Sequence, residues 1–481
     1  MLALGRRLTK WGELMPVRRE RRAYNSVPPP LPCTRVMLTM LAAMTVSLQA
    51  RGQAPLPIAP GARVVTVSPL GREEPTIAVN PRSPNQIVVA FQPPGEVAYS
   101  QDSGRTFSPS SGTAQPDWRR TGDVSLAFDI RGLAYLCYIA IDSQGSRYYW
   151  GHGSGRNGVV VRRSVDGGKS WEPTGAHVRV PPVSANTPFQ DMARIFADNG
   201  VRSPFAGHLY VGWIEWQLAR SVMLFSHSSD SGRTWSPAIR ISTHAGLPRD
   251  GNGDLVGFHG TVGPEGTVYA VWHDGNRITF TTSHDGGQTF APSRAIIETG
   301  PPYMGAIPDL GPVFGAMGFP QVAIAPNGQS LYVAWSDYSN GDIDVFLSRS
   351  ADAGRTWTQP LRVNSDPIHN GADQFFQWMA VDPVTGAIYV QFYDRRGDPA
   401  NRKTTVSLAR STDGAHTFTN YAWTTTPFDG HDVRLGDYMW LTAFDNRVSG
   451  AWAEVVPVDS TRTTLGYVPV IRVGTADFSH H

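Results

Sequence analysis

Acidic and basic side chains stand beside aromatic residues at several places in this sequence, and such groups could perform chemistry on sugars. Tyr438 follows Asp437, and the segment "FYDRRGD" places Asp394 next to Arg395 and Arg396. Aromatic rings can cover the apolar C–H face of a sugar. Carboxyl groups can bind hydroxyls, transfer protons or attack the anomeric carbon. These residue types therefore predict a carbohydrate site.

The full set of candidates stands at the ends of short apolar runs. The candidate catalytic residues are Tyr438, Asp394, Asp437 and Glu454. The candidate substrate-binding residues are Arg395, Arg396, Arg434, Glu74, Asp123, Glu215 and Asp274. Each acid also has a structural interpretation, because Asp–Arg pairs often hold loops together. The chemistry needs no cofactor and no metal, although several of these carboxylates together could hold a cation such as calcium.

A ten-residue phrase recurs six times along the chain, which is too often for an active site. One copy is "SSDSGRTWSP", which begins at Ser228. An aspartate can accept hydrogen bonds from the N–H groups of its own turn, and glycine readily adopts a positive φ. We therefore interpret the third-place aspartates as structural: Asp102, Asp166, Asp230, Asp285, Asp352 and Asp413. The last copy has Ala415 where the other five have glycine, so we expect its turn to be the weakest.

The spacing of the phrase predicts a β-propeller. Successive aspartates are 55 to 67 residues apart, which is enough for four short strands. Between them a pair of apolar runs recurs, as in "GFPQVAIAPNGQSLYVAW", and a seventh copy, "GDYMWLTAFDNRVSGAW", follows the last phrase. Each unit reads as strand, strand, strand, phrase, strand, the pattern of a propeller blade. Seven copies favour seven blades, with six as the alternative.

The expected ring needs a closing strand. The last unit lacks a fourth strand after "LGYVPVIRVG", and the segment "ARVVTVS" at 62–68 offers one. Pairing the two would remove both open sheet edges. The composition agrees with an all-β fold: the chain of 481 residues has 49 Gly, 38 Pro and 41% hydrophobic residues. Its apolar runs are short and show no helical spacing.

The first 54 residues predict a leader. They contain nine basic and two acidic side chains, a net charge of +7, while the whole chain has +2. The remaining residues therefore have a net charge of −5, and such an acidic domain is not expected to bind nucleic acid. A 15-residue apolar run at 36–50 has the length of a signal-peptide core. We expect a signal peptide, with translation starting near Met37; the alternative is a basic tail with a membrane anchor. Residues 55–481 then form a single domain.

This leader predicts a secreted or periplasmic protein that does not stay inserted in a membrane. Cys33 lies in the leader, so Cys137 would be the only cysteine of the exported chain. One cysteine cannot form an internal disulfide, and we expect Cys137 to be a small buried residue. We expect the exported protein to be a monomer.

The repeated S-x-D-x-G-x-T-W phrase resembles the Asp box of the sialidase-like propellers, also called the bacterial neuraminidase repeat. The resemblance covers roughly residues 62–475. It implies that the Asp boxes lie on the face opposite the active site. It also implies a Tyr nucleophile assisted by a Glu, an Asp acid/base and three Arg that grip a substrate carboxylate. By this resemblance Tyr438 matches the nucleophile, and Asp394 or Asp437 is the acid/base. Glu454 stands at the end of the second strand of the same blade, where the family has a Tyr-Glu pair.

The remaining family positions are matched only in part. Arg395, Arg396 and Arg434 would contact an anion. Glu73 stands where the family has its first Arg, and Gln377 or Gln321 where it has the assisting Glu. The hypothesis is a secreted sialidase-like glycoside hydrolase that acts on terminal sugars of glycans, with exo-α-sialidase as one form. A non-catalytic propeller that binds glycan or protein, and a polysaccharide lyase, are the alternatives.

Overall fold

The computed structural model describes residues 55–92, 95–113, 117–145, 151–248, 253–300, 318–429, 434–459 and 466–481. The predictions for the leader, including the signal peptide, the start near Met37 and Cys33, lie outside these residues. Residues 52–481 form one compact unit. Its described part contains strands and no helix, so no helix there is long and apolar enough to cross a bilayer.

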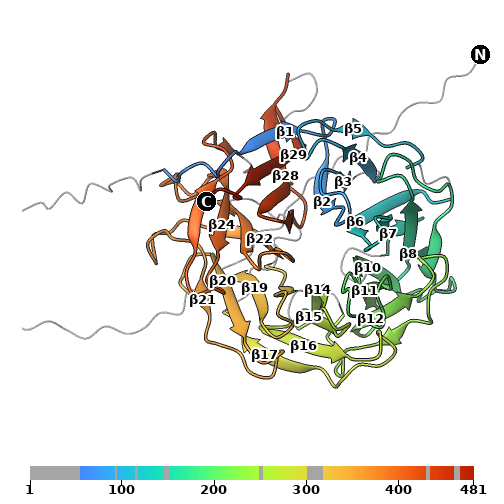
Figure 1. Cartoon of the computed structure of the whole chain (residues 1–481). Coiled ribbons are helices and arrows are strands. Elements are labelled where there is room, and N and C mark those ends of the chain that lie inside the picture. Colours follow the sequence, from blue (N-terminus) through green and yellow to red (C-terminus); the bar gives the residue numbers. More distant parts are fainter. Residues whose placement is uncertain are drawn as a thin grey trace, which may run out of the picture. The chain divides into compact units, whose positions relative to one another are not determined.

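Seven antiparallel sheets are arranged around a central axis, so the fold is a seven-bladed β-propeller, as the seven repeats predicted (Figure 1). Blade 1 contains β2 (Glu73–Val79), β3 (Ile87–Gln92), β4 (Glu96–Ser100) and β5 (Ser108–Pro109). Blade 2 contains β6 (Arg120–Phe128), β7 (Ala134–Ile141), β8 (Asn157–Ser164) and β9 (Ala176–Arg179). Blade 3 contains β10 (Phe189–Ala197), β11 (Leu209–Trp216), β12 (Ser221–Ser228) and β13 (Ile239–Arg240).

The other four blades follow in chain order. Blade 4 contains β14 (Leu255–Val262), β15 (Val268–Asp274), β16 (Arg277–Ser283) and β17 (Arg294–Glu298). Blade 5 contains β18 (Gln321–Ile324), β19 (Leu331–Asp337), β20 (Asp344–Ser350) and β21 (Leu361–Arg362). Blade 6 contains β22 (Gln374–Val381), β23 (Ile388–Asp394), β24 (Lys403–Ser411) and β25 (Thr419–Ala422), with β26 (Phe428–Asp429) also paired to β24. Blade 7 contains β27 (Trp440–Phe444), β28 (Arg447–Pro457), β29 (Tyr467–Asp477) and β1 (Arg63–Thr66).

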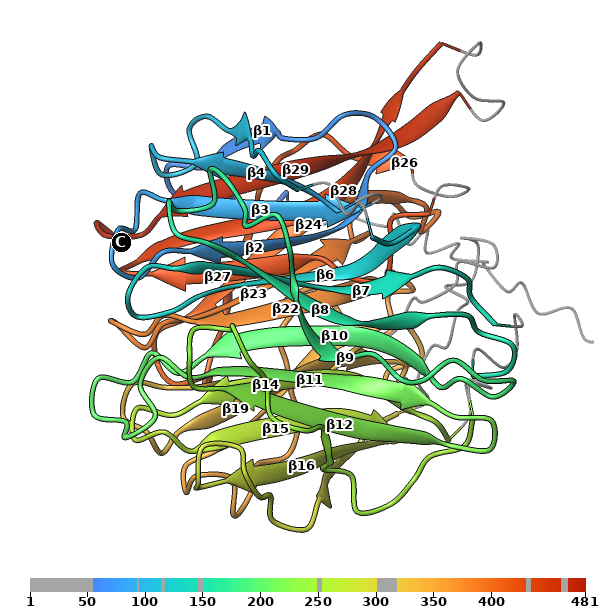
Figure 2. The same cartoon turned by 90° about the vertical axis from the view of Figure 1, so that its right-hand side faces the viewer.

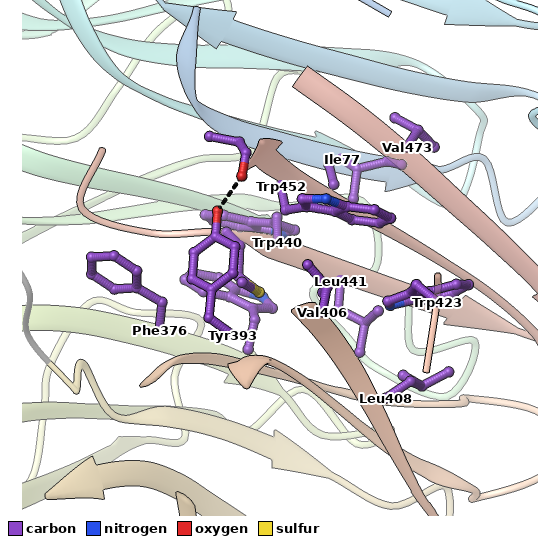
Figure 3. Packing of buried hydrophobic residues seen from close by; sticks show 14 of the residues in the cluster. Ile77, Phe376, Tyr393, Val406, Leu408, Trp423, Trp440, Leu441, Trp452 and Val473 are labelled. Carbon is purple, nitrogen blue, oxygen red and sulfur yellow. Dashed lines mark hydrogen bonds between the residues drawn. The ribbon is translucent and has the colours of Figure 1, made fainter. Parts of the chain in front are cut away.

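The second strand of a blade is apolar along most of its length because neighbouring blades cover both of its faces. All eight residues of β7 and of β11 are buried, and Cys137 in β7 is one of them. Figure 3 shows the contact of blades 6 and 7, where Tyr393 donates a hydrogen bond of 2.6 Å to the carbonyl of Ala453. Trp423 and Trp452 stack in the same cluster, with ring centroids 6.0 Å apart.

The N-terminal strand closes the ring as expected. β1 pairs with β29 over four residues, from Arg63 opposite Thr475 to Thr66 opposite Arg472. It is therefore the outermost strand of blade 7, whose other three strands come from the C-terminal end of the chain. In Figure 2, β1 lies above β29. Neither end of the ring is left as an open sheet edge.

The six repeated turns share one hydrogen-bond pattern. Each joins the third and fourth strands of a blade, and each aspartate accepts bonds from the N–H and the hydroxyl of the residue four positions later. The first-place serine accepts a bond from the N–H of the fifth residue. These bonds hold the pKa of Asp102, Asp285 and Asp352 at about 2. Ala415 has a φ of 62°, which strains an alanine but not the glycine found in the other copies.

We expect Asp230→Ala to lower the free energy of unfolding by about 1–2 kcal/mol, because it leaves turn donors without an acceptor. Asp230 accepts from the N–H groups of Arg233 and Thr234 at 3.0 and 2.9 Å. Denaturant unfolding measures the change. Glu265→Ala is the control, since that carboxyl is 63% exposed and pairs only with exposed Arg202. A folded Asp230→Ala protein that loses its activity would contradict the structural role.

The strand register separates the two ends of the ring. In blade 1, Ser100 of the Asp box lies opposite Ile87, while Glu96 lies opposite Phe91 and Glu73 opposite Gln92. The Asp box and the start of the innermost strand are therefore at opposite ends of the sheet. The end that carries the starts of the innermost strands is called the entry end below.

Candidate active site at the entry end

The innermost strands of five blades contain a β-bulge near the entry end. The pairing shifts after Glu73, Gly122, Asp191, Val256 and Phe375. The residue that follows each has a positive φ: 53° at Glu74, 46° at Asp123, 52° at Met192, 74° at Gly257 and 52° at Phe376. Such backbone strain at a non-glycine residue is uncommon and clusters at functional sites. The bulges turn the next side chains toward the axis.

Side chains from four blades meet at the axis. Arg194 of blade 3 lies over the ring of Tyr438 in blade 7, with 4.2 Å between its guanidinium carbon and the ring centroid. It is also 5.3 Å from Trp440, which stacks on Trp378 of blade 6 at 3.8 Å. His259 of blade 4 meets the edge of Trp378 at 5.4 Å. Burial lowers the pKa of His259 to about 3, so its imidazole is neutral.

A group of acids surrounds one guanidinium next to this cluster. Arg434 is 2.6 Å from Glu74, 3.1 Å from Asp437 and 3.5 Å from Glu73. Glu74 is only 2% exposed, and burial together with the charges of Asp437 and Asp123 raises its pKa well above the usual value for a glutamate. Burial also raises the pKa of Glu73. Three carboxyl groups share one cation, so the most buried of them, Glu74, is the one that keeps a proton.

Tyr438 connects the cluster at the axis to blade 2. Its hydroxyl donates a hydrogen bond of 3.4 Å to the carbonyl of Val124 in blade 2. Burial raises its pKa well above 10, the acids Glu74 and Asp123 add to the rise, and Arg194 opposes it. The phenol is therefore neutral, and it needs a base to become a nucleophile. Asp123 is buried and accepts a bond from the Met192 N–H at 3.3 Å.

Three of the predicted residues belong to a different network, in blades 5 and 6. Asp394 accepts bonds of 2.6 Å from both Arg396 and Ser407. Arg396 is also 3.7 Å from Asp366. Arg395 is 1% exposed and donates to the carbonyl of Asn401 at 2.7 Å. The structure therefore joins these three residues to partners in blades 5 and 6, and the acids whose charges raise the pKa of Tyr438 are Glu74 and Asp123 rather than Asp394.

The other predicted residues also have partners other than Tyr438. Glu454 pairs with Arg472 at 2.9 Å, and Glu215 pairs with Arg179 at 3.2 Å. Asp274 is 3.7 Å from Arg277. Of the sequence candidates, the structure thus brings together Glu74, Asp123, Arg434, Asp437 and Tyr438, and it leaves the rest elsewhere.

The glutamines at the family's assisting-Glu position lie in blades 5 and 6. Gln377 donates to Gln321 at 3.1 Å and to the carbonyl of Phe319 at 2.7 Å. The carboxyl group close to Tyr438 comes instead from Glu74 in blade 1. Within the described residues, no group of three or more His, Cys, Asp or Glu side chains is placed to hold a metal ion.

The sequence analysis missed Arg194, Trp378 and Trp440. Arg194 lies in "DMARIFAD" and is 4% exposed, although buried arginines are rare. A charged residue in the middle of an apolar inner strand is a signal that could have identified it. Its position over Tyr438 depends on the bulge after Asp191, which the sequence does not reveal.

Comparisons with known proteins find resemblance in structure alone. No family model matches the chain, and no curated protein matches it. Similar solved structures include a protein of unknown function from Dyadobacter fermentans, with 14% identity, 86% of this chain and 99% of that chain covered, and a TM-score of 0.46. The phage phi92 endosialidase has 12% identity, coverage of 87% and 70%, and a TM-score of 0.48. The α-L-arabinofuranosidase Arb93A from Fusarium graminearum has 12% identity, coverage of 76% and 96%, and a TM-score of 0.45. At these sequence identities and TM-scores, the similarity gives no information about the activity of this chain.

Proposed function

We propose that this propeller is a glycoside hydrolase that cleaves a terminal sugar at the entry end of the axis. The observation that carries the proposal is the position of Tyr438, whose buried ring lies under the guanidinium of Arg194 at 4.2 Å and whose pKa is raised by burial and by the charges of two acids, Glu74 and Asp123. A hydroxyl nucleophile, a proton donor and a proton acceptor are the groups that a retaining glycosidase of this kind needs.

Each group has a role that fits its surroundings. Glu74, which keeps its proton, donates it to the oxygen of the leaving group. Asp123 accepts the proton of Tyr438 as the phenol oxygen attacks the anomeric carbon. Arg194 stabilises the negative charge that develops on that oxygen. Water then attacks the anomeric carbon and transfers a proton to Glu74. The bond between the sugar and Tyr438 breaks, and the phenol oxygen takes back the proton held by Asp123.

The charges favour a neutral sugar over an acidic one. Arg434 is already surrounded by Glu73, Glu74 and Asp437, and the carboxylates of Glu73 and Asp437 repel a substrate carboxylate. Arg194 has no ion pair within 4.0 Å among the described residues, so its charge is available to an anionic sugar. A sialoside is therefore the second choice of substrate.

A panel of aryl glycosides that includes the sialoside tests the proposal by release of the chromophore. Turnover of any member that disappears in Tyr438→Phe supports it. If neither the panel nor natural glycans are turned over, the hydrolase proposal is wrong. A rise in the absorbance of unsaturated uronates would instead identify a polysaccharide lyase.

A glycan-binding propeller without catalysis is the second candidate. It is favoured by the neutral, buried phenol of Tyr438 and by the use of Arg395 and Arg396 inside the fold. Binding to a glycan array, with the bound sugar recovered chemically unchanged, would identify this function.

The raised pKa of Glu74 predicts a pH dependence of the activity. Glu74 holds its proton below its raised pKa, so a reaction that uses this proton slows as the pH rises through that value. We expect Glu74→Gln to remove this limb of the kcat/KM profile and to lower the rate by about 10²–10⁴-fold. Glu73→Gln is the control and should keep the limb. A Glu74→Gln profile with the limb unchanged would exclude Glu74 as the acid.

A further inference from the structure

One sequence pattern recurs where the second strand of a blade ends: a tryptophan followed two residues later by an acid. In blades 5 and 7 the indole N–H donates directly to this acid, with Trp335 to Asp337 at 2.8 Å and Trp452 to Glu454 at 3.4 Å. A buried indole N–H needs an acceptor. The acid therefore provides it.

In blade 3 the tryptophan and the acid are connected by hydrogen bonds through a third side chain. The indole of Trp213 donates to Gln190 Oε1 at 2.7 Å, and Gln190 Nε2 donates to Glu215 at 3.1 Å. The carboxamide of Gln190 thus accepts from the tryptophan and donates to the acid. Gln190 lies opposite Glu215 in the pairing of β10 with β11.

Blade 4 has the pair but lacks the bridge. Trp272 is 1% exposed, and its indole N–H has no hydrogen-bond partner among the residues that the structure describes. Asp274 is 3.7 Å from Arg277, which is longer than a hydrogen bond. The residue opposite Asp274 is Leu255, which takes the position of Gln190 and offers neither a donor nor an acceptor. An unpaired donor in a buried position costs free energy.

A cavity of about 120 Å³ lies at this point. Its lining includes Trp272, Asp274, Leu255, Arg277 and His244. The cavity is large enough for several waters, and so for a larger polar group. It shares no residue with the cluster around Tyr438.

We propose that this cavity is a binding site for a neutral sugar unit, in which one hydroxyl or acetamido group takes the place of the Gln190 carboxamide. The group accepts a hydrogen bond from the indole N–H of Trp272 and donates one to Asp274. The charges of Asp274 and Arg277, which are 3.7 Å apart, offset each other, and the guanidinium of Arg294 donates to the carbonyls of Gly354 and Arg355. A neutral group with both a donor and an acceptor meets all of these constraints.

The indole N–H resonance of Trp272 reports on the site directly. The protein is labelled with isotopic tryptophan in the Tyr438→Phe background, and the resonance is assigned through Trp272→Phe. The probes are methyl glycosides of neutral hexoses and of N-acetylhexosamines, whose comparison distinguishes a hydroxyl from an acetamido ligand. We expect at least one to shift the resonance with a Kd in the millimolar range. These probes need no hydrolysis, so failure of the proposed hydrolase leaves the test intact.

Two variants locate the binding. Leu255→Gln supplies the bridge of blade 3 and should abolish the shift, although it removes no polar group of the site. Asp274→Asn, which changes a partly exposed residue, should weaken binding about tenfold or more. Trp335→Phe in blade 5 is the matched control and should bind normally.

The proposal fails if no probe shifts the Trp272 resonance at concentrations up to about 50 mM, which would leave only water in the cavity. It also fails if acetate or sulfate shifts the resonance and the sugars do not. Unchanged binding in Asp274→Asn overturns it too, and this variant decides the matter if Leu255→Gln does not fold.

Discussion

Replacing Tyr438 by phenylalanine is expected to lower kcat by about 10²–10⁴-fold while the melting temperature barely changes. Phenylalanine keeps the ring that packs under Arg194 and beside Trp440, so the core stays filled. The change removes only the hydroxyl, which has a long hydrogen bond of 3.4 Å to the carbonyl of Val124 and a hydrogen bond with the Arg194 side chain. Steady-state kinetics on the best glycoside and thermal unfolding measure the two effects.

Tyr393→Phe is the matched control for this experiment. Tyr393 is also a buried tyrosine whose hydroxyl donates to a backbone carbonyl, that of Ala453 at 2.6 Å (Figure 3). Its loss should reduce stability by about 1 kcal/mol and leave kcat unchanged. A fully active Tyr438→Phe enzyme would exclude the tyrosine as nucleophile and leave the carboxyl groups of Glu74 and Asp123 as the catalytic pair.

Deletion of residues 62–68 is expected to turn a soluble protein into an aggregating one. The deletion removes β1 and exposes the outer edge of the eleven-residue strand β29 between Arg472 and Thr475, where the two strands pair. An exposed strand of this length can pair with other chains. Soluble yield and light scattering after purification measure the outcome.

A truncation that begins at Pro55 and keeps β1 is the control, and it should stay soluble. If the protein without residues 62–68 is equally soluble and equally stable, the strand pairing between Arg63 and Thr475 does not hold the ring together.

The fold could be predicted because its signals are local. The Asp-box phrase, the paired apolar runs and the segment at 62–68 each lie within a few neighbouring residues, and their number sets the number of blades. The site could be predicted only in part. Tyr438 and Asp437 stand at the start of an inner strand, so the repeat pattern predicts that they lie at the entry end of the ring. The position of Arg194 depends on a bulge and on contacts across the axis, which no local pattern shows.

The misleading segment was "FYDRRGD". An acid beside two arginines at the end of a second strand has the composition of a sugar site, but here the side chains bind partners inside the fold. Asp394 accepts from Ser407 in β24, and Arg395 from the same segment donates to Asn401 in the loop before β24. These partners come from other parts of blade 6, which no local pattern connects to the segment. Composition alone cannot distinguish such a network from a site that faces a ligand.

The closing strand also sets the order in which the molecule can be completed. β1 is made before the other strands, but its partner β29 (Tyr467–Asp477) is the last strand that the structure describes. The chain therefore has to keep an early strand unpaired until β29 has been synthesised. This pairing completes blade 7, and until it forms the outer edge of β29 remains exposed to other chains. A cell that makes this protein needs chaperones or dilute conditions most at that stage.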